Sequence, residues 1–388
     1  MMEENINTEA ENSRIVMLVF GTRPEAIKMC PLVKELKRRP GIKTFVCVSG
    51  QHHTMLQQVL KAFNIVPDID LAIMKDGQTL FDITERVLNG MRNVLLSVRP
   101  SLVLVHGDTS TAFASALAAF YLNIPVGHVE AGLRTYNVHS PYPEEFNRTA
   151  IGAIADYHFA PVKMACDNLI REGRNPERIW ITGNTAIDAL RTTVKDDYFH
   201  PELNWADGKR MILITAHRRE NLGNPMYHMF RAIRRVLDEH DDVRALYPIH
   251  LNPFVRQMAE KVFGKSSFGG MEERIHIIEP LDVIDFHNLM RKSYLILTDS
   301  GGIQEEAPSL SIPVLVMRDT TERPEGIYAG TLCLTGTDEE TIYNVFTRLL
   351  NDEDEYMKMA QASNPYGDGK ACARIADVIE YGECREFC

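Results

Sequence analysis

The sequence has no G-x-G-x-x-G segment, so the fingerprint with which many Rossmann folds bind a dinucleotide is missing. Its seven cysteines include no C-x-x-C pair and no Cys/His cluster at zinc spacing, so we interpret them as reduced thiols and expect neither a redox cofactor nor a metal. No stretch approaches the roughly 18 apolar residues of a membrane span. The sequence therefore predicts a protein without cofactor or membrane segment.

The sequence has no excess of positive charge, because 53 Asp and Glu residues outnumber 42 Lys and Arg residues and the formal net charge is −11. The one clear basic cluster, at residues 37–39, falls where a helix should end and is better explained as complementing the helix dipole than as binding nucleic acid. Residues 1–13 are polar and acidic and lack an apolar signal core, so we expect a disordered leader and a cytoplasmic protein. Nucleic acid is excluded as the expected partner.

The length of 388 residues exceeds what one hydrophobic core supports, which is about 250–300 residues. Short β-branched runs alternate with helical patterns twice along the chain, which predicts an α/β fold with two Rossmann-like doubly wound domains facing a central cleft. We expect an N-terminal domain over 14–190 and a C-terminal domain over 191–365. A C-terminal helix within 366–388 is expected to pack back on the first domain.

Charged residues follow several predicted strands of the first half, where ligands bind in open α/β sheets. Arg23 and Lys28 lie near a helix start after the first strand, a suitable place to meet phosphate or sugar oxygens. Asp108 ends another strand and could simply cap the next helix, whereas Glu130 is a poor cap.

Glu144 and Arg148 are spaced i, i+4 and share one helix face, which fits either a structural ion pair or a catalytic carboxylate kept charged by its neighbour. In the second half, His217 follows a strand in the segment TAHRRENLG, and Arg323 follows another. The turn at Ser300, Gly301 and Gly302 would let an anion approach helix N–H groups. A surface turn is the alternative interpretation for each of these segments.

Seven ordered segments carry a more specific signal: FGTRPEAIK, GDTSTAFA, HVEAGLRT, SPYPEEFNR, TAHRRENLG, TDSGGIQEEAP and TERPEG. Together they resemble the non-hydrolysing UDP-N-acetylglucosamine 2-epimerases, from about residue 14 to the end. The resemblance implies a fold similar to the GT-B glycosyltransferases. It also implies interconversion of UDP-N-acetylglucosamine and UDP-N-acetylmannosamine by elimination of UDP to a 2-acetamidoglucal and re-addition, without NAD or metal.

Carried over residue by residue, the resemblance implies an acid/base and charge-handling group at Asp108, Glu130, Glu144, Arg148 and His217. It implies nucleotide contacts at Arg23, Lys28, Phe286, Ser300, Gly301, Gly302, Glu306 and Arg323. Spacing does not decide which carboxylate abstracts the C2 proton.

Some members of the family bind a second UDP-N-acetylglucosamine as an activator, and four residues here match that allosteric site: Gln51, His52, Arg218 and His250. Two positions depart from the pattern, because Gly77 stands where an arginine is expected and Thr54 replaces a glutamine. A charge-assisted contact to the activator would be lost at Gly77, which puts activation in question. Leu281 replaces a nucleotide-contacting glutamine.

Three other functions remain open: a hydrolysing epimerase that releases N-acetylmannosamine and UDP, a GT-B glycosyltransferase, and a non-catalytic nucleotide-sugar sensor. The sensor would have no need of the acid/base group. The resemblance further implies a role in polysaccharide biosynthesis. A homodimer is expected from the resemblance and from the frequency of two-fold oligomers.

Overall fold

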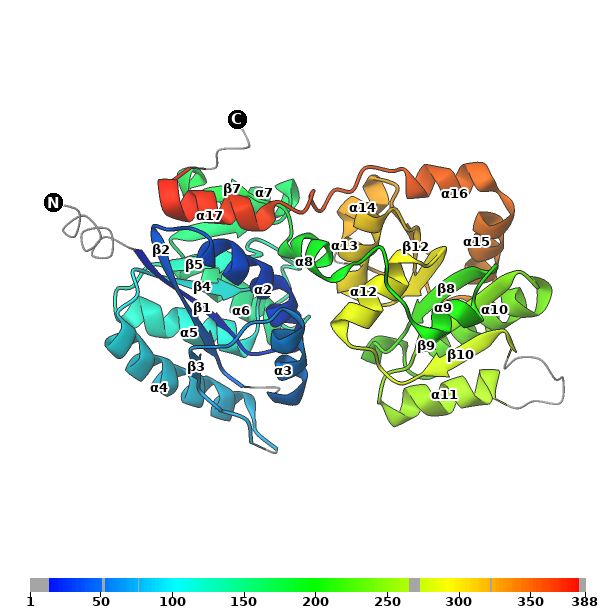
Figure 1. The fold of residues 1–388 in the computed structure, drawn as a ribbon, viewed down its shortest axis with the longest axis horizontal. Helices are drawn as coiled ribbons and strands as arrows, with labels where there is room; N and C mark the ends of the chain where they lie inside the picture. Colours follow the sequence, from blue (N-terminus) through cyan, green and yellow to red (C-terminus); the bar gives the residue numbers. More distant parts are fainter. Residues whose placement is uncertain (1–13, 51–52, 76, 265–272, 322, 384–388) are drawn as a thin grey trace. The chain divides into compact units, whose positions relative to one another are not determined.

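The computed structural model describes residues 14–50, 53–75, 77–264, 273–321 and 323–383. The chain divides into two compact units (Figure 1). Unit 1 extends to Thr192 and resumes at Gly367, and unit 2 is Thr193–Tyr366. Each unit has a parallel sheet between helices, which confirms the predicted class of two Rossmann-like α/β domains. The leader predicted at 1–13 lies outside the described residues.

Unit 1 alternates strands and helices along the chain. Its strands are β1 (Arg14–Phe20), β2 (Ile42–Val48), β3 (Ile69–Asp70), β4 (Leu102–His106), β5 (Val126–Val129), β6 (Tyr157–Ala160) and β7 (Ile179–Ile181). Its helices are α2 (Arg23–Lys37), α3 (His53–Ala62), α4 (Leu80–Val98), α5 (Ser110–Tyr121), α6 (Glu144–Ile154), α7 (Lys163–Arg171), η1 (Pro176–Arg178), α8 (Thr185–Thr193) and α17 (Ala371–Tyr381).

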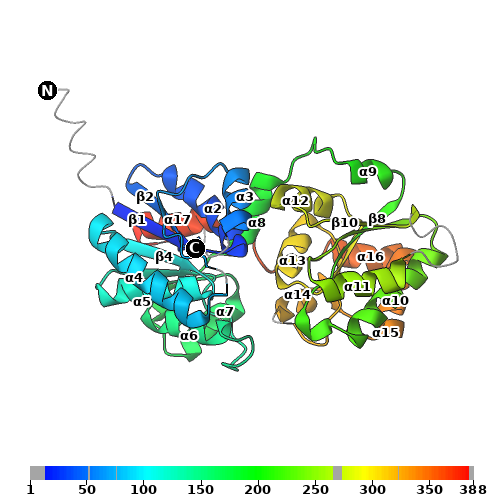
Figure 2. The same cartoon turned by 90° about the horizontal axis from the view of Figure 1, so that it is seen from below.

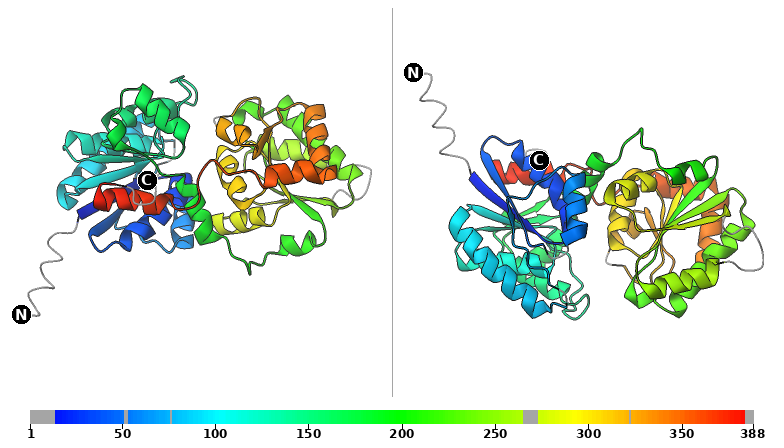
Figure 3. Two further views of the ribbon diagram at one scale, coloured as in Figure 1. Left: turned by 90° about the horizontal axis from the view of Figure 1, so that it is seen from above. Right: turned by 60° about the horizontal axis from the view of Figure 1, so that its bottom comes forward.

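The described strands of unit 1 form one sheet in the order β3-β2-β1-β4-β5-β6-β7. Met17 and Val19 on β1 pack in a core with α4, α5 and Ile151 of α6, which lie along the same side of the unit in Figure 2. The last helix, α17, packs against α2 (Figure 3). Both faces of the sheet are thus covered, which explains why β4 at its centre is buried along its whole length.

Unit 2 repeats this plan. Its strands are β8 (Arg210–Thr215), β9 (Val243–Pro248), β10 (Ile275–Ile278), β11 (Leu295–Thr298), β12 (Val314–Val316) and β13 (Leu332–Leu334). Its helices are α9 (Pro201–Trp205), η2 (Arg219–Asn221), α10 (Asn224–Glu239), α11 (Pro253–Phe263), α12 (Val283–Arg291), α13 (Gly301–Glu306), η4 (Ala307–Leu310), α14 (Pro324–Tyr328), α15 (Glu339–Asn351) and α16 (Glu353–Ala360).

The described strands of unit 2 are ordered β10-β9-β8-β11-β12-β13, and apolar residues from α10, α11 and α15 pack on one face. In unit 1 the strand order reverses between β1 and β4, and in unit 2 between β8 and β11. Ligands of doubly wound sheets bind beyond the carboxyl ends of the strands at such a reversal. In unit 1 a site is therefore expected at the turns that follow β1, β4 and the adjacent strand β5. In unit 2 it is expected at the turns that follow β8 and β11.

Gly132 closes the turn that follows β5, with φ at +90°. A Cβ at this position would lie 2.2 Å from the carbonyl oxygen of Ala165. We expect Gly132→Ala to destabilise the protein by about 2–6 kcal/mol, because left-handed strain and overpacking each cost about 1–3 kcal/mol. Urea unfolding of the variant measures this loss, and unchanged stability would contradict it. Gly173→Ala is the matched control, because Gly173 also has positive φ but a Cβ there would meet no atom within 4 Å.

Candidate active site

The turn after β1 is held by a buried carboxylate that sequence inspection missed. Glu25 accepts hydrogen bonds from the backbone N–H groups of Gly21 (3.0 Å) and Thr22 (2.8 Å). Its other oxygen accepts from the Thr109 hydroxyl at 2.7 Å, so the ends of β1 and β4 are tied together. Arg23 therefore begins α2 in a fixed position, with Thr22 as the expected N-cap.

Asp108 follows β4 and pairs with Arg148, whose Nη2 lies 2.5 Å from Asp108 Oδ2. The alternative interpretation of Asp108 as a helix cap is wrong, because Thr109 caps α5 and accepts from the Ala112 N–H. Burial raises the pKa of Asp108, with Glu130 and Glu144 acting in the same direction and Arg148 opposing them. A carboxyl group with a raised pKa is suited to taking up and returning a proton.

Glu130 follows β5 in the left-handed region, with φ at +63°. This conformation is uncommon outside glycine and asparagine and is often found at functional sites. Its carboxylate forms an ion pair with Lys28, and its Oε2 lies 3.4 Å from both His106 Nε2 and Asn184 Nδ2. The backbone strain and the neighbouring cation both support a role for Glu130 beyond packing.

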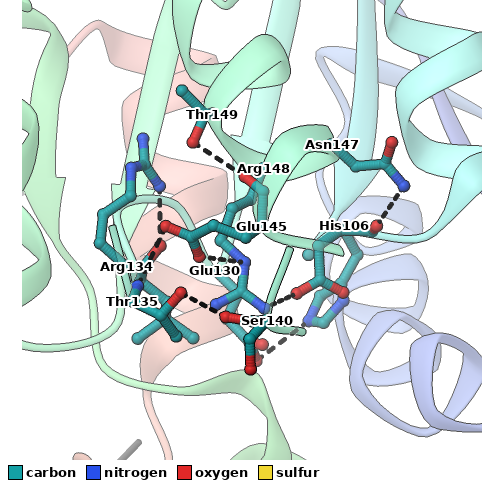
Figure 4. Close-up of polar contacts among 12 residues, drawn as sticks. His106, Glu130, Arg134, Thr135, Ser140, Glu145, Asn147, Arg148 and Thr149 are labelled. Atoms are coloured by element: carbon teal, nitrogen blue, oxygen red, sulfur yellow. Dashed lines mark hydrogen bonds and ion pairs between the residues drawn. The ribbon is translucent and has the colours of Figure 1, made fainter. Parts of the chain in front are cut away.

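Glu145 connects Arg148 to the preceding loop (Figure 4), and sequence inspection missed this residue too. Its Oε1 accepts from the N–H groups of Thr135 (3.0 Å) and Tyr136 (2.8 Å), and its Oε2 lies 3.6 Å from Arg148 Nε. Glu144, although spaced i, i+4 from Arg148, forms no ion pair among the described residues. The structural ion pair considered for Arg148 and Glu144 is therefore wrong, and Glu145 takes that place.

The backbone beside Asp108 depends on a neutral histidine. His128 on β5 is buried and its Nε2 lies 2.7 Å from the Gly107 carbonyl oxygen. Burial lowers the pKa of His128 to about 3, and burial lowers the pKa of His158 on β6 to about 4. Both imidazoles are thus uncharged in the folded protein near neutral pH.

We expect unit 1 to lose stability as the pH falls. The folded pKa of His128 lies below the value of about 6.5 in an unfolded chain, so its contribution is complete above pH 6.5 and is lost below it, by up to about 1.4 kcal/mol per pH unit. Urea titrations between pH 7 and 5 in a Trp205→Phe background measure this, because the remaining Trp180 lies in unit 1. His128→Gln should flatten the dependence, and an unchanged slope would contradict the assignment.

In unit 2, His217 follows β8 and its ring stacks on His250, with centroids 5.1 Å apart. The backbone N–H groups of His217 and Arg218 donate to the buried carboxylate of Asp299, at 2.9 and 2.8 Å. Burial is the main cause that lowers the pKa of His217, whereas Asp299 raises it. Arg218 and His250, predicted for the allosteric group, thus lie beside a residue predicted for the catalytic group.

Six of the eight residues expected to contact the nucleotide lie on α12, α13 and the start of α14, whereas Arg23 and Lys28 lie on α2. Ser300 caps α13, and its N–H donates to Thr298 Oγ1 at 2.9 Å. Arg323 forms an ion pair with Glu305, and Glu306 Oε2 lies 3.7 Å from His287 Nε2. Five of these residues lie on α13 or directly before α13 or α14: Ser300, Gly301, Gly302, Glu306 and Arg323. The sixth, Phe286, is half-buried on α12.

Of the remaining positions predicted for the allosteric site, some lie outside the residues that the structure describes. Gln51 and His52 lie outside the described residues, and Gly77 has φ at +69°. Among the residues that the structure describes, no group of three or more His, Cys, Asp or Glu side chains is placed to hold a metal ion. No helix within the same residues is long and apolar enough to cross a membrane.

Fold and site together define an α/β protein with acid/base groups at strand ends, and the comparisons give its family. The family model described as "UDP-N-acetylglucosamine 2-epimerase" matches residues 34–380. The UDP-N-acetylglucosamine 2-epimerase of Bacillus subtilis (strain 168) is 60% identical over 96% of this chain and 97% of its own length. The chain belongs to the UDP-N-acetylglucosamine 2-epimerase family of isomerases, which confirms the resemblance found in the seven segments.

Solved structures of relatives are similar to this chain in both sequence and fold. A co-structure of the S. aureus protein MnaA with UDP is 50% identical, has a TM-score of 0.87, and matches over 95% of this chain and 96% of that one. The UDP-GlcNAc 2-epimerase from Neisseria meningitidis, bound to UDP-GlcNAc, is 44% identical with a TM-score of 0.86, over 94% of this chain and 99% of that one.

Proposed function

We propose that the chain interconverts UDP-N-acetylglucosamine and UDP-N-acetylmannosamine by eliminating UDP to a 2-acetamidoglucal and adding it back. The observation that carries this proposal is the pair of carboxylates Asp108 and Glu130 at the ends of the adjacent strands β4 and β5, with Arg148 of α6 paired to Asp108. Family membership and the relatives' UDP and UDP-GlcNAc complexes support the substrate.

The chemistry requires one proton to leave C2 and another to return on the opposite face of the ring. Asp108 and Glu130 supply two carboxyl groups for this transfer, and the choice between them is left to experiment. Arg148, held on Asp108, favours the charged form of that carboxyl group, and Lys28 does the same for Glu130. Glu144, at the start of α6, adds a third carboxylate whose field acts on Asp108.

The departing UDP carries negative charge that unit 2 is proposed to stabilise. Gly301 and Gly302 offer backbone N–H groups, Ser300 offers its hydroxyl, Arg323 offers a cationic side chain, and His217 offers its imidazole. Glu306 and Phe286 are proposed to contact the nucleoside, with Arg23 and Lys28 of unit 1 near the phosphate or sugar.

A hydrolysing epimerase remains the second candidate, since it shares the elimination step and differs only in the fate of the glycal. Incubation with UDP-N-acetylglucosamine followed by chromatography distinguishes the two. We expect UDP-N-acetylmannosamine at equilibrium with the substrate. Free N-acetylmannosamine with a stoichiometric amount of UDP as the main products would overturn the proposal, and consumption of an added sugar acceptor would instead indicate a glycosyltransferase.

Regulation and assembly are proposed on the resemblance. Arg218 and His250 would contact an activating UDP-N-acetylglucosamine together with Gln51 and His52, and we propose that Gly77 weakens this activation. We also propose a cytoplasmic homodimer that supplies polysaccharide biosynthesis. A dependence of the rate on substrate concentration that is hyperbolic rather than sigmoidal would support weakened activation.

A further inference from the structure

Asp299 is a buried carboxylate at the reversal of strand order in unit 2. It directly follows β11, and its side chain reaches the turn that follows the neighbouring strand β8. Its exposed fraction is 0%. A carboxylate removed from water in this way is costly unless hydrogen bonds and charges compensate it, so its contacts indicate what it does.

One carboxylate oxygen of Asp299 holds the turn after β8. Oδ2 accepts from the N–H groups of His217 and Arg218, at 2.9 and 2.8 Å, and from Asn221 Nδ2 at 3.1 Å. Asn221 is itself buried and also donates to the Met317 carbonyl oxygen at 3.2 Å. Three donors on one oxygen are sufficient for a purely structural role.

The other oxygen has a different environment. Oδ1 has no hydrogen-bond partner within the described part of the chain, and it lies 3.6 Å from Nδ1 of His217. Among the described residues of unit 2, the other charged or titratable groups that act on His217 are His250, which lies just after β9 and stacks on its ring, and Arg218, next along the chain. Asp299 is therefore the anion among the groups around this imidazole.

We propose that Asp299 is a positioning residue that keeps Nδ1 of His217 protonated and turned toward Oδ1, so that Nε2 is presented to the phosphate of the bound nucleotide. This inference rests on the proposed function of His217 in stabilising the departing UDP. The carboxylate fixes the backbone of the turn with one oxygen and the tautomer of the imidazole with the other. A ring whose orientation is fixed needs no reorganisation when charge develops on the leaving group.

The negative charge of Asp299 shifts the pKa of His217 in one direction. Burial, His250 and Arg218 lower the pKa of His217, and Asp299 raises it. Removing the negative charge of Asp299 therefore lowers this pKa further and depletes the imidazolium at neutral pH. Activity that depends on the imidazolium should then decline at a lower pH than in the unmodified enzyme.

The test is ¹⁵N NMR of the histidines in the full-length protein with UDP bound, first without any substitution. We expect neutral His217 to carry its proton on Nδ1. In Asp299→Asn, whose amide can still accept from the turn, we expect the proton to move to Nε2 and the pKa of His217 to fall by about one unit or more. We also expect kcat to fall at least about tenfold with the UDP dissociation constant changed less than about threefold.

Asn221→Ala is the matched control, since it removes one donor from Asp299 Oδ2 and leaves the charge facing His217. It should lower thermal stability without changing the His217 tautomer. A neutral His217 protonated on Nε2 in the unsubstituted protein would overturn the inference, as would a loss of kcat in Asp299→Asn without any change in tautomer or pKa. His217→Gln with full activity would instead refute the proposed function of His217, which separates the two failures.

Discussion

Asp108→Asn or Glu130→Gln should slow epimerisation by at least about a hundredfold and leave the affinity for UDP nearly unchanged, which is the usual scale of acid/base catalysis. Both substitutions keep the size of the side chain and remove the group that exchanges a proton. UDP is proposed to bind mainly through unit 2, whereas both carboxylates belong to unit 1. Turnover should therefore fall without a matching loss of affinity for UDP.

The two variants should also differ from each other. Asn at position 108 leaves the guanidinium of Arg148 paired with Glu145, whereas Gln at position 130 removes the carboxylate that pairs with Lys28. The variant that no longer exchanges the C2 proton of UDP-N-acetylglucosamine with solvent identifies the residue that abstracts that proton. Initial rates with each UDP-sugar, together with UDP titration by calorimetry, give the required numbers.

Asp167→Asn is the control for this experiment. Asp167 is a half-exposed carboxylate of α7 that pairs with Lys163, so the same chemical change occurs within unit 1 without touching the strand ends. Its turnover should match that of the unmodified enzyme. Near-normal turnover in both Asp108→Asn and Glu130→Gln would remove these residues from the catalytic group.

Glu145→Ala should destabilise unit 1 by about 3–5 kcal/mol, because truncating one partner of a buried ion pair leaves an uncompensated charge. Glu145 is 1% exposed, and its removal leaves the N–H groups of Thr135 and Tyr136 without their acceptor and Arg148 without one of its two carboxylates. For a unit of roughly 200 residues this corresponds to a fall in Tm of about 10 °C.

Thermal unfolding followed by Trp180 fluorescence in the Trp205→Phe background measures this loss in unit 1. Glu145→Gln is the matched variant, because its carbonyl oxygen can still accept from the loop while the negative charge that faces Arg148 is lost. Its stability should lie between those of Glu145→Ala and the unmodified protein. Equal stability of all three proteins would show that the connection from the loop to Arg148 contributes nothing.

The sequence predicted the fold class because parallel strands that are buried on both faces are apolar and β-branched along their length, as in β1 and β4. It also placed Asp108, Glu130 and His217 at strand ends, since a charged residue after such a run marks the edge where ligands bind. Family membership followed from the order of seven segments rather than from any single one.

Contacts between residues far apart in the chain could not be predicted. Position alone left Asp108 as a candidate cap, and only the dihedral angles of Thr109 decide which residue precedes α5. The i, i+4 rule favoured Glu144 as the partner of Arg148, whereas the loop at Thr135 recruits Glu145 instead. Asp299 and His217 are 82 residues apart, so no local pattern indicates that one holds the other.

The most direct test of the proposed C2 inversion is an NMR time course of UDP-N-acetylglucosamine with the enzyme in heavy water. We expect deuterium to appear at C2 of UDP-N-acetylmannosamine and, as the reaction returns, at C2 of the substrate, with the UDP-sugars conserved. Formation of UDP-N-acetylmannosamine that keeps its original C2 proton would contradict proton transfer through Asp108 and Glu130.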